Sequence, residues 1–419
     1  MITQIRSQIK ESSTGIIISI VAFMLWPLGA FISSIKYAGT RIFSVLMVSF
    51  YFLYGYTYII AGKDQDNFRI AKYFTEWSGL TFDALWSKII TLYELGNKPD
   101  LFQDFLQFTV SRFTNNVQVY FAVTATLFGL VAAALFKVVL TTDSKIKRND
   151  FFLVCVTLFL LLVLSPGRIN SFRHYFGVAI FTYSLYRYLN GEGFKYLFLL
   201  MLTPFIHFAF VMIIPLVLIQ KLISNRLYIY YLLIVISFFL SGSVADYLGD
   251  FTRSIDESSL QYQAKQYTSE AYLQKVDELK TKRTYILDIY TYATTVYFLF
   301  VVVYLAWMTR IKDRTILSIY GMCLLLFVFV NLFRDLESVS NRFGVMFHGL
   351  CCILLIRLFT LPNFKVPVFI KATFAVVMIF NAVVILRILA QTASVSTILL
   401  FFPISILFPI DVSVLDWIK

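Results

Sequence analysis

Long apolar runs dominate this chain, and short polar segments separate them. A helix needs about 20 apolar residues to cross the hydrocarbon core of a bilayer. The pattern predicts spans near residues 15–35, 41–61, 117–140, 151–166, 174–190, 227–245, 284–309, 315–333, 342–361 and 366–390. Two further apolar stretches, 194–220 and 397–410, do not fit a simple crossing. We therefore expect an all-α fold, a polytopic membrane helical bundle with about 10–12 transmembrane segments.

Two long polar segments, 62–116 and 246–283, interrupt the series of spans. Acidic residues slightly outnumber basic ones in both, so neither carries the excess of Lys and Arg that retains a loop in the cytoplasm. Three short connections are rich in Lys and Arg instead: Lys145–Arg148, Lys221–Arg226 and Arg310–Arg314. The positive-inside rule predicts that these three are cytoplasmic and that the long segments are external loops of a single integral membrane domain, residues 1–419.

Counting crossings between these anchors gives a conflict at residues 194–220. A single crossing there would leave Lys221 and Arg226 outside. The conflict disappears if the segment enters and leaves on the same side. Pro204 and Pro215 favour this, because proline breaks helical hydrogen bonding and irregular backbone is tolerated where protein surrounds it. We predict a re-entrant helical hairpin at 194–220, whose apex near Thr203–His207 points outward.

The first 35 residues allow two arrangements. No small-residue cleavage site follows a short hydrophobic core, so the first apolar run is expected to be retained as a span. The crossing count then places the N-terminus outside, despite Arg6 and Lys10. Alternatively, residues 1–35 form an interfacial helix and a hairpin bent at Pro27 and Gly29.

Composition agrees with a membrane protein. Hydrophobic residues make up 59% of the chain and charged residues 14%, well below the roughly 25% of soluble domains. The net charge of +12 is dispersed among short loops, which disfavours nucleic acid and favours anionic lipid or an anionic lipid-linked substrate. The four cysteines lie inside apolar runs and show no disulfide or zinc spacing. No phosphate-binding glycine loop or standard hydrolase motif is present.

The turn between two spans, from Ser165 to Tyr175, carries the clearest candidate chemistry. Arg168, Arg173 and His174 follow a Pro-Gly pair there, where charge close to hydrocarbon is costly. A single arginine at a span boundary often only extends to the interface, and for Arg168 that alternative stands beside a functional one. For Arg173 we favour function. A guanidinium binds phosphate bidentately and stays charged.

Other candidate residues are more isolated. His207 lies beside the proline break in the segment of abnormal topology, and it is either a buried structural histidine or a proton acceptor for an attacking hydroxyl. Asp64 directly follows a span and is a candidate for orienting a sugar. Arg334 and Arg342 belong to a mixed-charge turn that internal ion pairs would also explain; Arg342 is the more promising of the two. His348 is expected to be structural.

Several short motifs together resemble a known family. An Asn-x-x-Arg turn opens a helix at Asn170–Arg173, and a later apolar segment ends in Phe-x-His at Phe205–His207. With Asp64-Gln-Asp-Asn-Phe-Arg and Asn341-Arg342-Phe343, the chain resembles the EpsG-like branch of Wzy-type oligosaccharide repeat-unit polymerases. The family often has Asn-Gly-Ile-Arg-Gln where this chain has Asn-Ser-Phe-Arg-His, and a Ser at the position of Ala209.

The resemblance implies a glycosyltransferase of the bacterial inner membrane that uses polyprenyl-diphosphate-linked oligosaccharides on the external face to build capsule, exopolysaccharide or O-antigen. Arg173, with Arg168 or Arg342, would bind the diphosphate. His207 would deprotonate or orient the acceptor hydroxyl, and Asp64 would position sugar. Asn170, His174 and Arg334 are further candidates for substrate contact. No cofactor or metal is expected. The lipid bilayer, a flippase and a chain-length regulator are the candidate partners.

Two other classes of function remain open. A flippase or other transporter of lipid-linked oligosaccharide should carry its polar residues along a cavity at mid-membrane depth, whereas here they gather at one face. A glycan ligase or an acyltransferase would also need basic residues that bind an anionic substrate.

Overall fold

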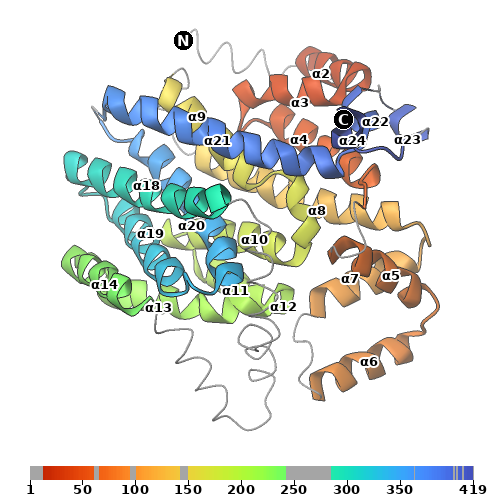
Figure 1. Cartoon of the computed structure of the whole chain (residues 1–419), viewed down its shortest axis with the longest axis horizontal. Coiled ribbons are helices and arrows are strands. Elements are labelled where there is room, and N and C mark those ends of the chain that lie inside the picture. The colour runs from red at the N-terminus through yellow and green to blue at the C-terminus, as the bar shows by residue number, and fades with distance from the viewer. Residues whose placement is uncertain are drawn as a thin grey trace. The chain divides into compact units, whose positions relative to one another are not determined.

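The computed structural model describes residues 13–60, 66–94, 101–141, 150–241, 285–362, 364–399, 402, 404–407 and 410–418. Within these ranges the regular structure is helical, and the only β-type pairings are isolated bridges (Figure 1). Six stretches of helix in this part of the chain are long and apolar enough to cross a membrane, and further apolar helices are shorter. The expected fold class is confirmed: the chain is an all-α, multi-pass membrane protein.

The chain forms two compact units. Unit 1 contains residues 1–80, 103–183 and 378–419, and unit 2 contains residues 81–102 and 184–377. Three helices begin in one unit and end in the other: α7 (Leu101–Ser111), of which only the first two residues belong to unit 2, α10 (Phe172–Leu189) and α21 (Val368–Thr392).

Unit 1 begins with a bent pair of helices instead of one continuous span. Helix α2 (Ser13–Leu25) stops before Trp26, and α3 (Pro27–Ser34) starts with proline at its first position and packs against α2. The ring of Trp26 covers Gly29 so closely that a Cβ atom there would lie 2.0 Å from it. The bend at Pro27 and Gly29 is therefore the arrangement present, and the short turn η1 (Ile35–Tyr37) follows it.

The tightest helix pair of unit 1 joins α4 (Arg41–Tyr56) to α8 (Val117–Thr141). The hydroxyl of Thr40 accepts a hydrogen bond from the Phe43 amide and so caps the start of α4. Near its end, Gly55 lies against the backbone of Phe121, where a Cβ atom would approach the carbonyl oxygen to 2.3 Å. The absence of a side chain thus allows the two backbones to approach closely.

The first long polar segment is largely helical where it is described. It contains α5 (Asp66–Ser78) and α7 (Leu101–Ser111) in unit 1 and α6 (Phe82–Glu94) in unit 2. Short helices also form at the C-terminal end of unit 1: α22 (Val395–Leu399), α23 (Ile404–Leu407) and α24 (Val414–Ile418). The second predicted loop, 246–283, lies outside the described residues.

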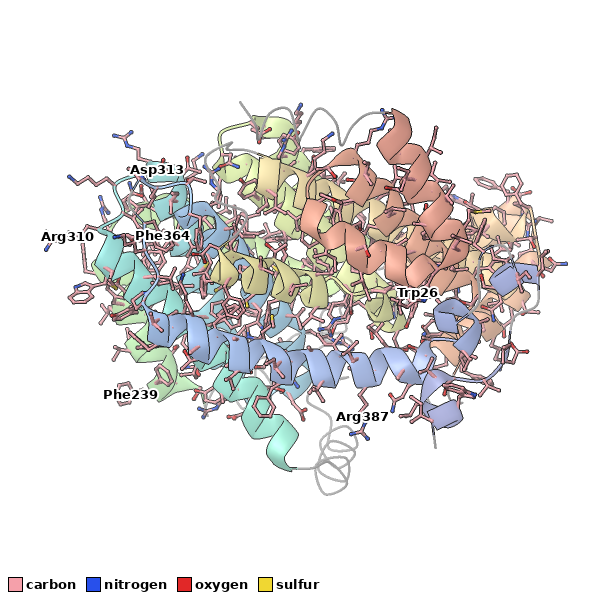
Figure 2. All side chains as sticks on the ribbon, turned by 90° about the horizontal axis from the view of Figure 1, so that it is seen from above. Trp26, Phe239, Arg310, Asp313, Phe364 and Arg387 are labelled. Carbon is pink, nitrogen blue, oxygen red and sulfur yellow. The ribbon has the colours of Figure 1, made fainter. Side chains whose placement is uncertain are left out.

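In unit 2, α19 (Arg314–Leu332) lies beside α14 (Leu227–Leu240), α18 (Tyr285–Thr309) and α20 (Glu337–Leu358), as Figure 1 shows. Every residue of α19 from Ile319 to Asn331 is buried. The outer side of α14 is apolar and exposed, and Phe239 projects away from the ribbon (Figure 2). This surface is what a helix facing lipid should present.

The segment predicted as a hairpin is broken into four short pieces: α11 (Phe194–Met201), α12 (Thr203–Ile206), η3 (Phe208–Met212) and α13 (Ile214–Ile223). Pro204 and Pro215 each lie in the first turn of a new helix, where the missing amide hydrogen costs little. The irregular backbone around His207 is therefore present. Entry and exit on the same side of the membrane stay a prediction.

Candidate functional site

The arginine-bearing turn of unit 1 is a short 3₁₀ helix, η2 (Pro166–Ser171), between α9 (Phe151–Val163) and α10. Tyr51 of α4 donates a hydrogen bond from its hydroxyl to the carbonyl of Leu164, just before the turn. Gly167 packs on α21, because a Cβ atom there would lie 2.9 Å from Leu389. The turn is thus held by helices remote from it in sequence, and η2 also contacts α5 and α8.

Arg168 is half-buried and anchored by an aromatic residue seven positions later. One terminal nitrogen of its guanidinium group donates to the Tyr175 hydroxyl at 3.0 Å, and the group lies 4.6 Å above that ring. Its Nε atom is buried with no hydrogen-bond partner among the described residues. Among the residues that the structure describes, no carboxylate forms an ion pair with Arg168. A fixed guanidinium with unused donors is suited to bind an anion.

The other three predicted residues of the turn follow Arg168 directly. Asn170 is half-buried, and its side-chain oxygen has no hydrogen-bond partner within the described ranges. Arg173 is half-buried in the first turn of α10, whereas His174 is fully buried and packs edge-on against Tyr175. Buried His174 is therefore placed to support the turn, and Arg168 and Arg173 are the more accessible cations.

A buried acid and a buried tyrosine accompany Arg173. Asp104 of α7 is 6% exposed and Tyr120 of α8 is 1% exposed. The Tyr120 hydroxyl lies within electrostatic reach of both Arg173 and Asp104. Neither residue was predicted from the sequence, although polar residues at 103, 104, 107 and 111 recur with helical spacing.

In unit 2, the His207 ring is fixed by a hydrogen bond from the backbone two residues later. Its extended conformation separates α12 from η3, and its Nδ1 atom accepts a hydrogen bond from the Ala209 amide at 3.3 Å. A neutral imidazole whose Nδ1 accepts must carry its hydrogen on Nε2. In this geometry the neutral ring presents a hydrogen-bond donor, which suits orienting a hydroxyl or an anionic oxygen.

Aromatic contacts connect His207 to the start of α20, where Arg342 lies. The His207 ring packs against Phe210 at a centroid distance of 6.4 Å, and Phe210 packs against Phe343 at 5.8 Å. Arg342 directly precedes Phe343 and is half-buried. These two predicted residues therefore belong to one aromatic-lined region of unit 2.

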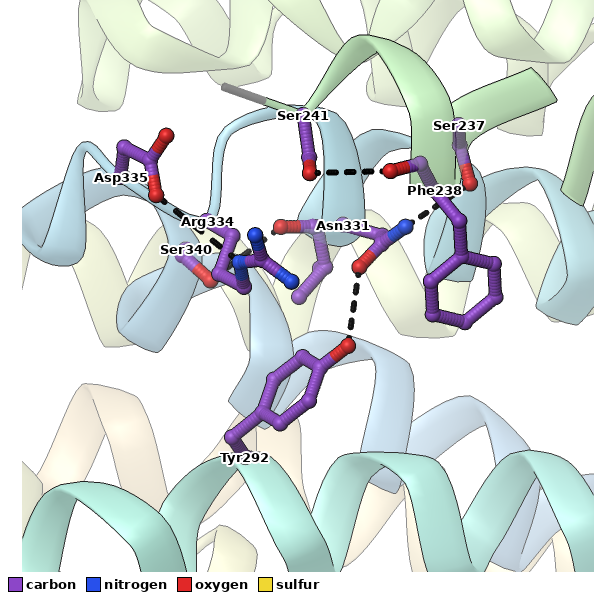
Figure 3. A network of polar contacts seen from close by, with 9 residues as sticks. Ser237, Phe238, Ser241, Tyr292, Asn331, Arg334, Asp335 and Ser340 are labelled. Atoms are coloured by element: carbon purple, nitrogen blue, oxygen red, sulfur yellow. Dashed lines mark hydrogen bonds and ion pairs between the residues drawn. The ribbon is translucent and has the colours of Figure 1, made fainter. Parts of the chain in front are cut away.

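Arg334 lies at the edge of a polar network that joins three helices (Figure 3). Its guanidinium lies 5.6 Å from the ring centroid of Tyr292, and its Nε atom is 3.8 Å from Asp335. The Tyr292 hydroxyl donates to Asn331 at 3.2 Å, and Asn331 donates to Ser237 at 3.0 Å. Asn331 thus links α14, α18 and α19. This residue was not predicted from the sequence, although an asparagine inside an apolar span is itself a signal of a polar contact.

The predicted site residues fall into two groups, one in each unit. Arg168, Asn170, Arg173 and His174 share the turn of unit 1, and His207, Arg334 and Arg342 belong to unit 2. Asp64 lies outside the described residues. His348, expected to be structural, forms a 3.1 Å hydrogen bond between its Nε2 atom and Thr295 and so links α18 with α20.

Comparison with known proteins extends this picture to most of the chain. The family model described as the EpsG family matches residues 41–405. No curated protein and no solved structure matches the chain. The matched range includes the arginine-bearing turn, His207 and the start of α20. EpsG is a Wzy-like, polymerase-related family, and membership indicates a membrane glycosyltransferase-like polymerase of polysaccharide biosynthesis. The chain belongs to the EpsG family.

Proposed function

We propose that this protein polymerises polyprenyl-diphosphate-linked oligosaccharide repeat units on the external face of the bacterial inner membrane. The observation that carries the proposal is a cationic turn, supported by buried contacts, in a chain of the EpsG family. A polymerase of lipid-linked units must hold a diphosphate close to the membrane surface. Arg168 and Arg173 supply that chemistry.

In the proposed reaction, an acceptor hydroxyl attacks the anomeric carbon of the donor sugar. The bond between this carbon and the diphosphate oxygen breaks, and the polyprenyl diphosphate leaves with the bonding electron pair. Negative charge therefore grows on the diphosphate. Half-buried guanidinium groups stabilise such charge better than exposed ones, because water screens them less.

We assign the residues of unit 2 a separate role. His207 presents Nε2–H in its neutral form, so we propose that it orients the acceptor hydroxyl by donating to its oxygen. The proton released by that hydroxyl passes to water at the membrane surface. Arg342 is a second candidate for binding an anionic group, since it is half-buried near the same aromatic residues.

The deciding experiment replaces Arg173 with Ala in the producing cell and examines the glycan. We expect single repeat units to be exported and attached without polymer, and the turnover of purified protein to fall by about 10²–10³-fold. Arg173→Lys keeps the charge but loses bidentate binding, and should retain part of the activity. Arg226→Ala, an exposed arginine of a short connection, is the matched control and should leave polymer unchanged.

Other outcomes would identify other functions. Loss of all external glycan in the Arg173→Ala strain would indicate a flippase. Full-length polymer that remains on its carrier lipid would indicate a ligase. Unchanged polymer at normal protein level, or a strict requirement for divalent ions by the purified protein, would contradict the proposed role of the arginines.

A further inference from the structure

Helix α7 of unit 1 turns polar side chains inward and an apolar one outward. Gln103, Asp104 and Gln107 are all buried, whereas Phe105 is 55% exposed. We call these three buried residues the inner polar face. The same helix also buries Phe108 and Val110, so polar and apolar side chains are buried together. The three polar side chains give up their hydration on burial, which is costly unless each finds a hydrogen-bond partner.

Several polar atoms around this face have no hydrogen-bond partner among the described residues. They include the side-chain oxygens of Gln103 and Gln107, the oxygen of Asn67 on α5, and the hydroxyl of Tyr120 on α8. Each of these residues is at least nine-tenths buried. The orientation of the Gln107 amide is fixed, because its nitrogen donates to the carbonyl of Ile70 and an oxygen in that place could not. A buried polar group without a partner costs stability, so its presence needs a reason.

One hydrogen bond and one ring contact show that the helices carrying these atoms are neighbours in unit 1. The amide nitrogen of Gln107 donates to the carbonyl of Ile70 on α5 at 3.1 Å. The Tyr120 ring packs on Phe74 of α5 at 5.2 Å, and its hydroxyl lies within electrostatic reach of Asp104 and Arg173. The inner polar face is thus continuous with the arginine-bearing turn.

The chemistry of these groups selects the ligand. Uncharged amide oxygens, a carboxylate and a phenol hydroxyl mainly accept hydrogen bonds, so they bind a partner rich in donors. Sugar hydroxyl groups are such donors, and the nearby rings of Phe74 and Tyr120 offer apolar surface for the carbon–hydrogen face of a sugar. A diphosphate presents only acceptors and would be repelled here, whereas Arg168 and Arg173 attract it.

We propose that the inner polar face, with Asn67 and Tyr120, is a saccharide-binding subsite that receives the sugar attached to the diphosphate. The proposal rests on the proposed function, because it places a glycosyl diphosphate at the arginine-bearing turn. The side chains are enclosed, so binding requires the elements around them to separate and close again over the sugar. The unpaired atoms gain their hydrogen bonds only in the closed complex.

Tyr120→Phe is the sharpest test, since it removes only the unpaired hydroxyl. Full-length protein in nanodiscs is mixed with the repeat-unit oligosaccharide released by mild acid from the lipid-linked pool of the producing cell, and binding is followed by saturation-transfer NMR. We expect wild-type protein to bind, and Tyr120→Phe to bind about 5- to 10-fold more weakly while its midpoint of thermal unfolding stays equal or rises. Gln103→Met, which is close to isosteric, should behave in the same way.

Tyr186→Phe is the matched control. Tyr186 is also fully buried, its hydroxyl also lacks a partner in the described part of the chain, and it belongs to unit 2. This variant should bind the oligosaccharide like wild type. Absence of saturation transfer to wild type, normal binding by both Tyr120→Phe and Gln103→Met, or an equal loss in Tyr186→Phe would overturn the subsite.

Binding of inorganic diphosphate separates this inference from the proposed function. Tyr120→Phe should bind diphosphate as wild type does, and Arg173→Ala should bind it at least tenfold more weakly. Normal sugar binding by the Tyr120 and Gln103 variants together with loss of diphosphate binding in Arg173→Ala would reject the subsite alone. Unchanged diphosphate binding in Arg173→Ala would count against the proposed function instead.

Discussion

Among single residues, His207 shows how a backbone contact limits chemistry. Its Nδ1 atom is occupied by the Ala209 amide, so the neutral ring donates through Nε2. A general base at Nε2 would need the other tautomer and the loss of that hydrogen bond. The sequence alone indicates an imidazole near a proline break, but only the local geometry indicates which nitrogen the backbone amide occupies.

Two amide substitutions distinguish donation from proton transfer at His207. Gln extends an N–H group to about the reach of Nε2, whereas Asn can replace only the contact made by Nδ1. We expect His207→Gln to polymerise roughly tenfold faster than His207→Asn, with the pH dependence of wild type. If His207 is the base, the polymerisation rate of both variants falls equally, by about 10²–10⁴-fold, and the pH dependence of the rate changes. Initial rates of purified protein between pH 6 and 8, with exposed Phe205→Leu as control, provide the measurement.

Among helices, the α4–α8 pair depends on one glycine. A Cβ atom at Gly55 would lie 2.3 Å from the carbonyl oxygen of Phe121 and 2.7 Å from the Ala125 side chain. Because backbone cannot move aside as a flexible side chain does, Gly55→Ala should destabilise the protein by about 1–3 kcal/mol. We expect a lower midpoint of thermal unfolding in detergent. Gly79→Ala, where nothing lies within 4 Å, is the control, and equal midpoints for the two variants would contradict this account.

Helix positions follow from the sequence much more readily than helix contacts do. Long apolar runs predicted α4, α8 and α19, because crossing the hydrocarbon core needs about 20 apolar residues. The polar residues between two such runs predicted the turn at 166–174. The hydrogen bond between the hydroxyls of Tyr54 and Thr392 joins residues 338 positions apart. No local pattern predicts such a pair. The inward polar side of α7 was missed for a related reason: periodicity identifies two faces but not which one is buried.

For the whole chain, the distribution of charge predicts the membrane topology. The protein is well suited to a test of this topology by cysteine labelling. The four native cysteines, Cys155, Cys323, Cys351 and Cys352, are all buried and have no disulfide. A membrane-impermeant maleimide should therefore give little background in the wild-type chain. Single cysteines can then be placed at exposed positions on predicted loops without first removing the native ones.

Three such positions test the crossing count and the re-entrant segment together. Asn115, Asn225 and Lys312 are exposed. Asn115 lies in the first predicted external loop, and the other two lie in basic connections that are predicted to be cytoplasmic. Because excess Lys and Arg retains short loops in the cytoplasm, we expect Asn115→Cys to react in intact spheroplasts, and Asn225→Cys and Lys312→Cys to react only after permeabilisation. Reaction of Asn225→Cys from outside would mean that residues 194–220 cross the membrane once. His207 would then lie within an ordinary crossing, and the predicted outward apex around it would be wrong.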